Sequence, residues 1–159
     1  MTEDARFEDG REAPLNLGAE DAEDLKVISA LVQDAVFPVT EMKWDRANRQ
    51  FALLLNRFRW EDRPAADRRG RAFERVQSVV LVRDVIAVQS QGIDRSDADM
   101  ILSVLALEYT ETDAPSGHLD VTLAGDGALR LNVEALDVSL RDVTRPYLAP
   151  SRKAPDHGA

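Results

Sequence analysis

The stretch QFALLLNRFRW, residues 50–60, decides the fold. Its first half is the most apolar strand-like run in the sequence, and its second half mixes arginines with aromatic residues. Strand alternation puts Phe51, Leu53 and Leu55 on one face, and the opposite face also begins apolar. We therefore expect a core strand whose first half is covered on both faces and lies under a helix. Five residues at its far end are expected to reach the surface: Asn56, Arg57, Phe58, Arg59 and Trp60.

One amphipathic helix is predicted before this strand, over residues 21–37. Apolar side chains such as Leu25, Ile28 and Val32 recur at helical spacing and define one face. Asp21 is the expected N-cap, and the acidic residues around it suit the positive end of the helix dipole. Pro38 then ends the helix, because proline cannot continue it.

The rest of the chain alternates like β-strands. A strand over 39–45 should form a hairpin with residues 50–60, and Gly125-Asp126-Gly127 predicts another hairpin turn. Residues 134–143 fit either a short helix or a strand, and we favour a strand after a bulge near 134–135. The remaining predicted strands cover 14–17, 72–82, 85–91, 100–110, 118–124 and 128–133.

This order predicts an α+β domain over residues 14–146. One N-terminal amphipathic helix would cover a meandering antiparallel sheet or a partly closed β-barrel, of pleckstrin-homology-like or split-barrel architecture. Residues 1–13 and 150–159 are expected to be disordered tails, and 61–71 a mobile surface loop.

Composition narrows the class of protein. The 159-residue chain is 44% apolar and 31% charged, which is an ordinary balance for a globular protein. It has no cysteine, which excludes disulfides and cysteine metal sites and fits a cytoplasmic protein. We expect neither a signal peptide nor a membrane span. The net charge of −9 makes nucleic acid an unexpected partner.

One segment departs from this acidic average. Residues 57–75 hold seven arginines and four acids, a net charge of +3 that leaves −12 for the rest of the chain. Arginines beside exposed aromatic rings could bind phosphates, carboxylates or stacked bases. In the structural interpretation, Phe58 and Trp60 instead pack against the core, and Arg57 and Arg59 pair with nearby acids.

Other candidate sites are weaker. Asp34 stands near the C-terminal end of the predicted helix, where a carboxylate is unfavourable unless an arginine compensates it. It would either tie helix to sheet or act as an acid in a cleft. His118 is expected at the surface and His157 in the tail, so a zinc site is not expected. The acids of residues 94–99 do not match the spacing of a calcium loop.

Four segments carry a resemblance to a known family: residues 21–25, 33–36, 55–61 and 88–94. Among them, Asn-Arg-Phe-Arg-Trp at 56–60 is the most specific. The sequence resembles a family of small alphaproteobacterial proteins catalogued as a domain of unknown function, over residues 14 to about 146. The resemblance implies a single-domain bacterial cytoplasmic protein and brings no activity or site residue with it.

The leading hypothesis is a non-enzymatic binding or accessory module that uses the Arg/aromatic surface, with Asp34 nearby, to bind an acidic protein partner or a small anion. The alternative is a small enzyme with carboxylate and arginine chemistry in a cleft between helix and sheet. Neither hypothesis invokes a cofactor or a metal. An exposed strand edge could also be closed by a homodimer.

Overall fold

The computed structural model describes residues 14–62 and 74–148. The predicted tails, His157 and most of the predicted 61–71 loop lie outside these residues. The helix is α2, Ala22–Leu31, and two short 3₁₀ helices are η1, Val39–Glu41, and η2, Trp60–Asp62. The strands are β1 Asn16–Ala19, β2 Val36–Pro38, β3 Met42–Asp45, β4 Gln50–Phe58, β5 Glu74–Val82, β6 Val85–Gln91, β7 Ile101–Glu111, β8 Gly117–Leu123, β9 Ala128–Val133, β10 Val138–Asp142 and β11 Tyr147–Leu148.

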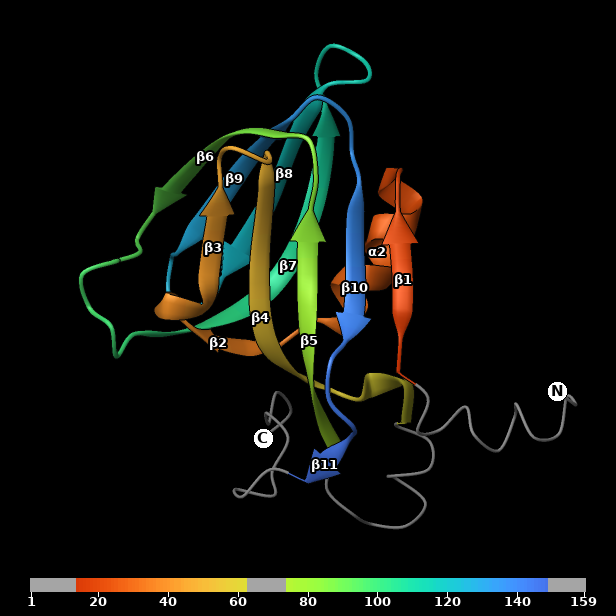
Figure 1. Cartoon of the computed structure of the whole chain (residues 1–159), viewed down its shortest axis with the longest axis vertical. Helices are drawn as coiled ribbons and strands as arrows, with labels where there is room; N and C mark the ends of the chain where they lie inside the picture. Colours follow the sequence, from red (N-terminus) through yellow and green to blue (C-terminus); the bar gives the residue numbers. More distant parts are fainter. Residues whose placement is uncertain (1–13, 63–73, 149–159) are drawn as a thin grey trace, which may run out of the picture.

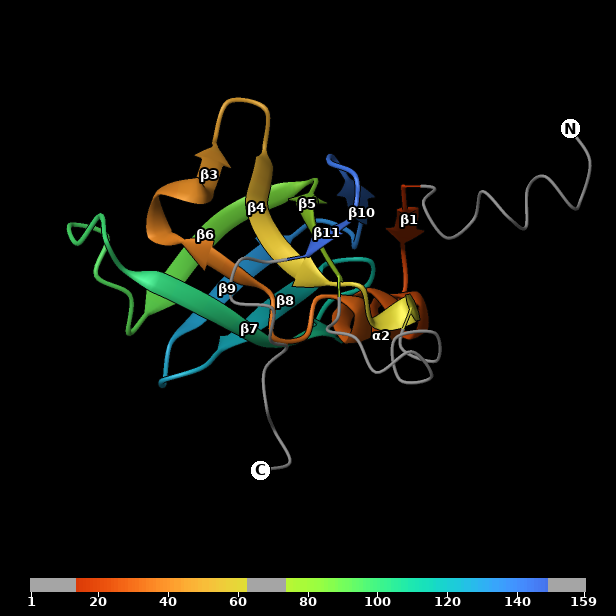
Figure 2. The ribbon, with the colours of Figure 1, turned by 90° about the horizontal axis from the view of Figure 1, so that it is seen from below.

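The strands form an open sheet in the order β1-β10-β5-β4-β2-β7-β8-β9-β6, with β3 added to β4 and β11 to β5. Figures 1 and 2 show that the sheet bends into two facing layers, with β4, β5 and β10 opposite β7, β8 and β9. The predicted α+β class with one helix is therefore confirmed. The barrel is partial, since β1 and β6 end the path without pairing with each other.

The core lies between the two layers. Alternate residues of β4, such as Phe51, Leu53 and Leu55, are at most 2% exposed and belong to the same buried apolar cluster as residues of β8 and β9. Leu119 and Leu131, which pair across β8 and β9, are fully buried. The period-2 burial of each strand follows from the pleat, because successive side chains point to opposite faces.

The helix is shorter than predicted and covers a different strand. Asp21 caps it as expected, accepting a hydrogen bond from the Asp24 backbone N–H at 2.8 Å. It ends at Leu31 because Asp34 adopts a left-handed conformation, φ 64°, and the chain then turns into β2. Its buried side packs on β7 and β1, so the prediction that it covers residues 50–60 is wrong.

Most of the other element predictions are confirmed. β6 and β9 have the predicted bounds, and β10 decides for a strand over 138–142. The β8–β9 hairpin turns through Gly125 and Asp126, both with positive φ. The predicted strand over 39–45 is shorter, because η1 occupies residues 39–41 and, within this segment, only β3 pairs with β4.

Candidate functional site

Arg57 lies inside the protein and is fully used by its neighbours. Its side chain is 0% exposed. Nε donates to Ser78 Oγ and Asp142 Oδ1, both at 3.1 Å, and Nη2 donates to Asp142 Oδ2 at 3.0 Å. Nη1 and Nη2 also donate to Glu61 Oε1 and Oε2, both at 2.9 Å, and Nη1 donates to the Phe58 carbonyl at 3.2 Å. All five N–H groups of the guanidinium therefore have acceptors.

The position of this cluster follows from strand register. Arg57, Ser78 and Asp142 occupy inward positions of the neighbouring strands β4, β5 and β10, just beyond the apolar core. Burial disfavours the charged form of Arg57, but its hydrogen bonds to Glu61 and Asp142 outweigh this effect and raise the pKa of Arg57 above its ordinary value. The cluster is thus a buried ion network that joins three strands.

The neighbouring side chains are also held by the protein. Phe58 is 1% exposed, with the Arg75 guanidinium carbon 4.6 Å from its ring centre. Arg59 is 5% exposed and pairs with Glu74 at 3.2 Å. Trp60 is partly exposed, and its ring nitrogen donates to the Gln33 carbonyl at 2.9 Å. The Tyr147 hydroxyl donates to the Asn56 side chain.

The prediction that this end of the strand reaches the surface is therefore wrong for Arg57, Phe58 and Arg59. The structural interpretation is confirmed, since the rings pack and the arginines pair with acids. A stacking platform for bases needs Phe58 or Trp60 exposed beside the arginines. Phe58 is buried and Trp60 is half-buried, and Arg57 and Arg59 beside them are buried.

Asp34 is likewise placed by the backbone. It is 4% exposed, and its N–H donates to the Val104 carbonyl of β7 at 2.8 Å. The predicted tie between Asp34 and an arginine stays a prediction. The face of α2 that meets the sheet is filled by Leu25 and Ile28, both 1% exposed, and Asp34 lines neither of the two hollows described below.

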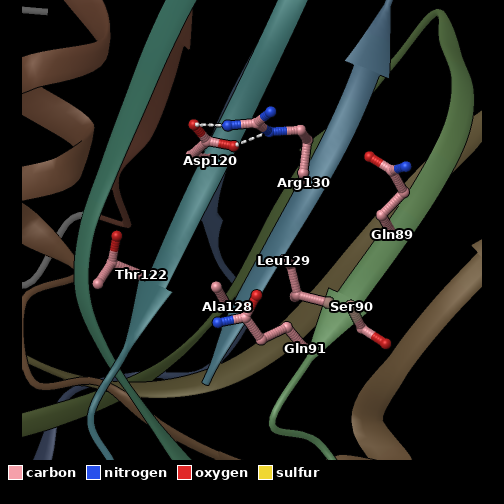
Figure 3. Close-up of a pocket in the computed structure, with 8 residues that line it drawn as sticks. All are labelled: Gln89, Ser90, Gln91, Asp120, Thr122, Ala128, Leu129 and Arg130. Carbon is pink, nitrogen blue, oxygen red and sulfur yellow. Dashed lines mark hydrogen bonds and ion pairs between the residues drawn. The ribbon is translucent and has the colours of Figure 1, made fainter. Parts of the chain in front are cut away.

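A polar hollow of about 540 Å³ lies on the outer face of β6, β9 and β8 (Figure 3). Strand register aligns its side chains in two rows across these strands. Asp120, Arg130 and Gln89 form one row, and Thr122, Ala128 and Gln91 form the next. The small Ala128 side chain lies between longer neighbours, which leaves the hollow open in the middle.

The ion pair in this hollow neutralises itself. Arg130 Nε donates to Asp120 Oδ1 at 2.8 Å, and Nη2 donates to Oδ2 at 3.1 Å. These contacts raise the pKa of Arg130 above its ordinary value, and the hydrogen bonding to Asp120 is a larger cause than the charge of Asp120. Gln89, Gln91 and Thr122 are exposed, and none of their side chains forms a hydrogen bond within the described part of the chain. The hollow thus offers amide and hydroxyl groups around a neutral pair.

A second hollow, of about 530 Å³, lies beside the N-terminus of α2. Two of its carboxylates already have partners in the protein, since Asp21 caps the helix and Asp137 pairs with Arg83 at 3.3 Å. The Tyr109 hydroxyl donates to the Pro115 carbonyl at 3.0 Å. Burial, and to a lesser extent the charge of Glu111, raise the pKa of Tyr109. The acidic residues that line this second hollow are Glu20, Asp21, Asp84, Glu111 and Asp137.

The two weaker candidate sites of the sequence analysis, His118 and the loop over residues 94–99, are not arranged to bind a metal ion. His118 Nδ1 lies 3.4 Å from Asp120 Oδ2, and its side chain is 18% exposed. Asp94 is satisfied within its own loop, by the Ser96 backbone N–H at 3.0 Å and by the Ser96 hydroxyl. Within residues 14–62 and 74–148, no group of three or more His, Asp or Glu is placed to hold a metal ion. No helix in these ranges is long and apolar enough to cross a membrane.

The sequence analysis missed the hollow over β6, β9 and β8. One signal was available: Asp120 and Arg130 lie in the two strands of the predicted Gly125–Gly127 hairpin, on the same face by strand alternation, so they were predictable as near neighbours. The observed register is symmetric about Gly125 and places them directly opposite each other. The neighbouring Gln89 could not be placed in this way, because β6 and β9 are joined by no short turn.

The chain was compared with known protein families, curated proteins and solved structures. The family model described as "Protein of unknown function (DUF2948)" matches residues 15–157 of the chain. No curated protein matches this chain, and no solved structure matches it.

Proposed function

Because the chain belongs to the DUF2948 family, whose description carries no activity, we propose a function from the geometry: it is a non-enzymatic binding module. Its binding surface is the hollow on the outer face of β6, β9 and β8. The ligand is a small uncharged molecule with adjacent hydrogen-bond donors and acceptors, such as a carboxamide or a polyol.

The observation that carries this proposal is the combination of open amides and a closed ion pair. Gln89 and Gln91 each offer one carbonyl oxygen and one NH₂ group on the same face of β6. The Asp120–Arg130 pair beside them cancels its own charge. A ligand here can form paired hydrogen bonds without having to balance a charge, and the volume is within the range of small-molecule sites.

The ligand class also suits the whole molecule. A chain with net charge −9 repels free anions at long range, so a neutral ligand approaches it at no electrostatic cost. The acidic partner or small anion expected from Arg57 and Arg59 stays a prediction. Inorganic phosphate is the appropriate probe for anion binding, because phosphate would bind an accessible guanidinium group.

The test is an NMR titration of ¹⁵N-labelled protein with acetamide, glycerol and inorganic phosphate in parallel. The side-chain amide signals of Gln89 and Gln91 should move with a neutral probe and stay in place with phosphate. Gln89→Leu should weaken the binding about 5- to 10-fold, since one hydrogen-bonding group is worth ~1–1.4 kcal/mol. Ala128→Phe should abolish it by filling the hollow.

Thr110→Val is the matched control, because it removes a hydroxyl from β7 on the same outer face of the sheet while leaving the hollow intact. Neutral probes that leave both glutamine signals unmoved would overturn the proposal. So would a response that survives Ala128→Phe in a folded protein. Movement with phosphate alone would overturn the ligand class and favour the anion.

Two broader parts of the proposal come from the sequence. The absence of cysteine supports a cytoplasmic protein, and the resemblance supports an alphaproteobacterial source. Fractionation of the native cells with an antibody against the chain tests the first part, and recovery in the periplasmic fraction would contradict it.

A further inference from the structure

β6 ends the sheet path with one edge open. It pairs with β9 along one side, and in the described ranges no strand pairs with its other side. At its start the Val85 N–H donates to the Arg49 carbonyl at 2.9 Å, so the β3–β4 turn occupies that end of the edge. Further along, Gln89, Ser90 and Gln91 are exposed and keep regular register with β9. The open part of the edge is therefore the second half of β6.

This edge lacks the usual protection against pairing. Natural edge strands are commonly short or carry charges, prolines or bulges that prevent association. The other edge strands of the described residues follow this rule: β1 has four residues, β3 has four including Lys43 and Asp45, and β11 has two. β6 has seven residues, VIAVQSQ, with no charge and no proline, in a chain that is 31% charged. Its one bulge lies at the start, between Val85 and Ala87.

We infer that the open edge of β6 pairs with β6 of a second copy of this chain, antiparallel about a twofold axis at Ser90. In that register Ser90 faces Ser90 of the other copy, and Gln89 faces Gln91. The sequence Gln-Ser-Gln is symmetric, so the pairing is self-complementary, as a twofold interface requires. A glutamine opposite a glutamine always matches, because each amide both donates and accepts.

A second copy suits this edge better than a charged partner does. No charged side chain of β6 is available to recognise an acidic or a basic segment. The two copies repel each other through their net charges of −9, so the association should be weak and should strengthen with salt, which screens that repulsion. An interface held by salt bridges would show the opposite dependence.

The experiment is sedimentation velocity of the full chain from the micromolar to the millimolar range, at low and at high salt. A concentration-dependent dimer that is more populated at high salt is expected. Ser90→Lys should abolish it, since two lysines would meet at the twofold axis. Thr110→Lys, which makes the same charge change on β7, should leave the dimer in place or strengthen it, because it reduces the size of the negative net charge.

Three results would overturn the inference. One is a monomer at every concentration and salt level. Another is a dimer that persists in the Ser90→Lys variant. The last is a dimer that Thr110→Lys disrupts as completely as Ser90→Lys does, while circular dichroism shows that both variants are folded. Ser90→Pro removes a backbone N–H from the edge without adding charge, and it should also abolish the dimer. The inference does not rest on the binding of a small molecule, because Ala128→Phe fills the hollow without touching the β6 backbone edge.

Discussion

Arg57 and Asp142 lie 85 residues apart in the chain and meet through two hydrogen bonds, Nε to Oδ1 at 3.1 Å and Nη2 to Oδ2 at 3.0 Å. The Asp142 carboxylate also accepts from the Ser78 hydroxyl at 2.6 Å and from the Leu15 backbone N–H at 2.9 Å. One buried carboxylate therefore joins β4, β5, β10 and the residue that precedes β1. An ion network of this kind positions strands more than it stabilises them, because burying both charges costs nearly what their attraction returns.

Breaking that network from one side should be costly. Arg57→Leu leaves Asp142, 5% exposed, without its cation, and we expect the free energy of unfolding to fall by about 3–5 kcal/mol. Urea unfolding followed by tryptophan fluorescence measures the loss. Arg130→Leu is the control, because its ion pair is 48% exposed on the arginine side and should contribute at most about 1 kcal/mol.

The double variant Arg57→Leu/Asp142→Leu separates the two effects. It removes both charges, so it should lose less stability than the two single variants added together. Strict additivity would show that Arg57 and Asp142 do not act as a pair.

Ser29 ties the helix to the sheet. Its hydroxyl accepts from the Leu107 backbone N–H of β7 at 2.9 Å, on the stretch of β7 that α2 covers. Ser29→Ala should cost about 1–3 kcal/mol, because that N–H is left part-buried without an acceptor. Hydrogen exchange should show the Leu107 amide exchanging faster. Lys26→Ala, on the exposed side of the same helix, should change stability by less than about 0.5 kcal/mol.

Gly117 is required by a close approach of β7. A Cβ at this position would meet the Thr110 carbonyl at 2.4 Å and the Tyr109 hydroxyl at 2.6 Å. Gly117→Ala should lower the thermal midpoint by an amount that corresponds to about 1–3 kcal/mol, since backbone must move to admit the methyl group. Gly18→Ala is the comparison, because its nearest neighbour is 3.9 Å away. Equal losses at both positions would contradict the packing argument.

The pKa of Asp94 should depend on one serine. Its carboxyl pKa is held below the ordinary value, first by the Ser96 hydroxyl and then by the Ser96 N–H. Ser96→Ala should raise it toward the ordinary value, as read by NMR titration of the side-chain carbon. Asp45, whose pKa is lowered by Asn48 in another loop, should not respond.

The sign of the related pH effect follows from this direction. A carboxyl whose folded pKa is lowered stabilises the fold above its unfolded pKa, and this contribution is lost as pH falls through the folded value. Any stability from Asp94 should therefore disappear below about pH 4. A loss of the Ser96 effect as pH rises toward neutrality would contradict this assignment.

Strand positions were predictable because alternation is local. β6, β9 and the β8–β9 turn could be read from patterns of seven residues or fewer. The end of the helix could not, because Val36 and Phe37 continue the apolar pattern of α2 and yet form β2. Their partners decide the outcome: β2 pairs with β7, and Val36 also pairs with β4. These contacts are 20 or more residues away and outweigh helical periodicity.

The burial of the arginines was unpredictable for the same reason. An arginine at the end of an apolar strand reads as a surface residue unless its acceptors are known. Glu61 is four residues from Arg57, but Asp142 is in a strand that reaches β4 only through β5. By contrast, Asp120 and Arg130 lie on the same face of the two strands of the predicted hairpin, so their closeness was predictable from sequence, whereas the position of Gln89 was not.

The place of β10 between β1 and β5 has a consequence for synthesis on the ribosome. β1 precedes the other described strands in the chain, and its only strand partner in the described part of the chain is β10, with Asn16 opposite Arg141. β1 therefore cannot pair until β10, made more than 100 residues later, has left the ribosome. Until then the nascent chain exposes the edge of β5 as well, because β10 covers it too. Ribosome-associated chaperones would meet both unpaired edges in this interval, and the late docking of β10 closes them together.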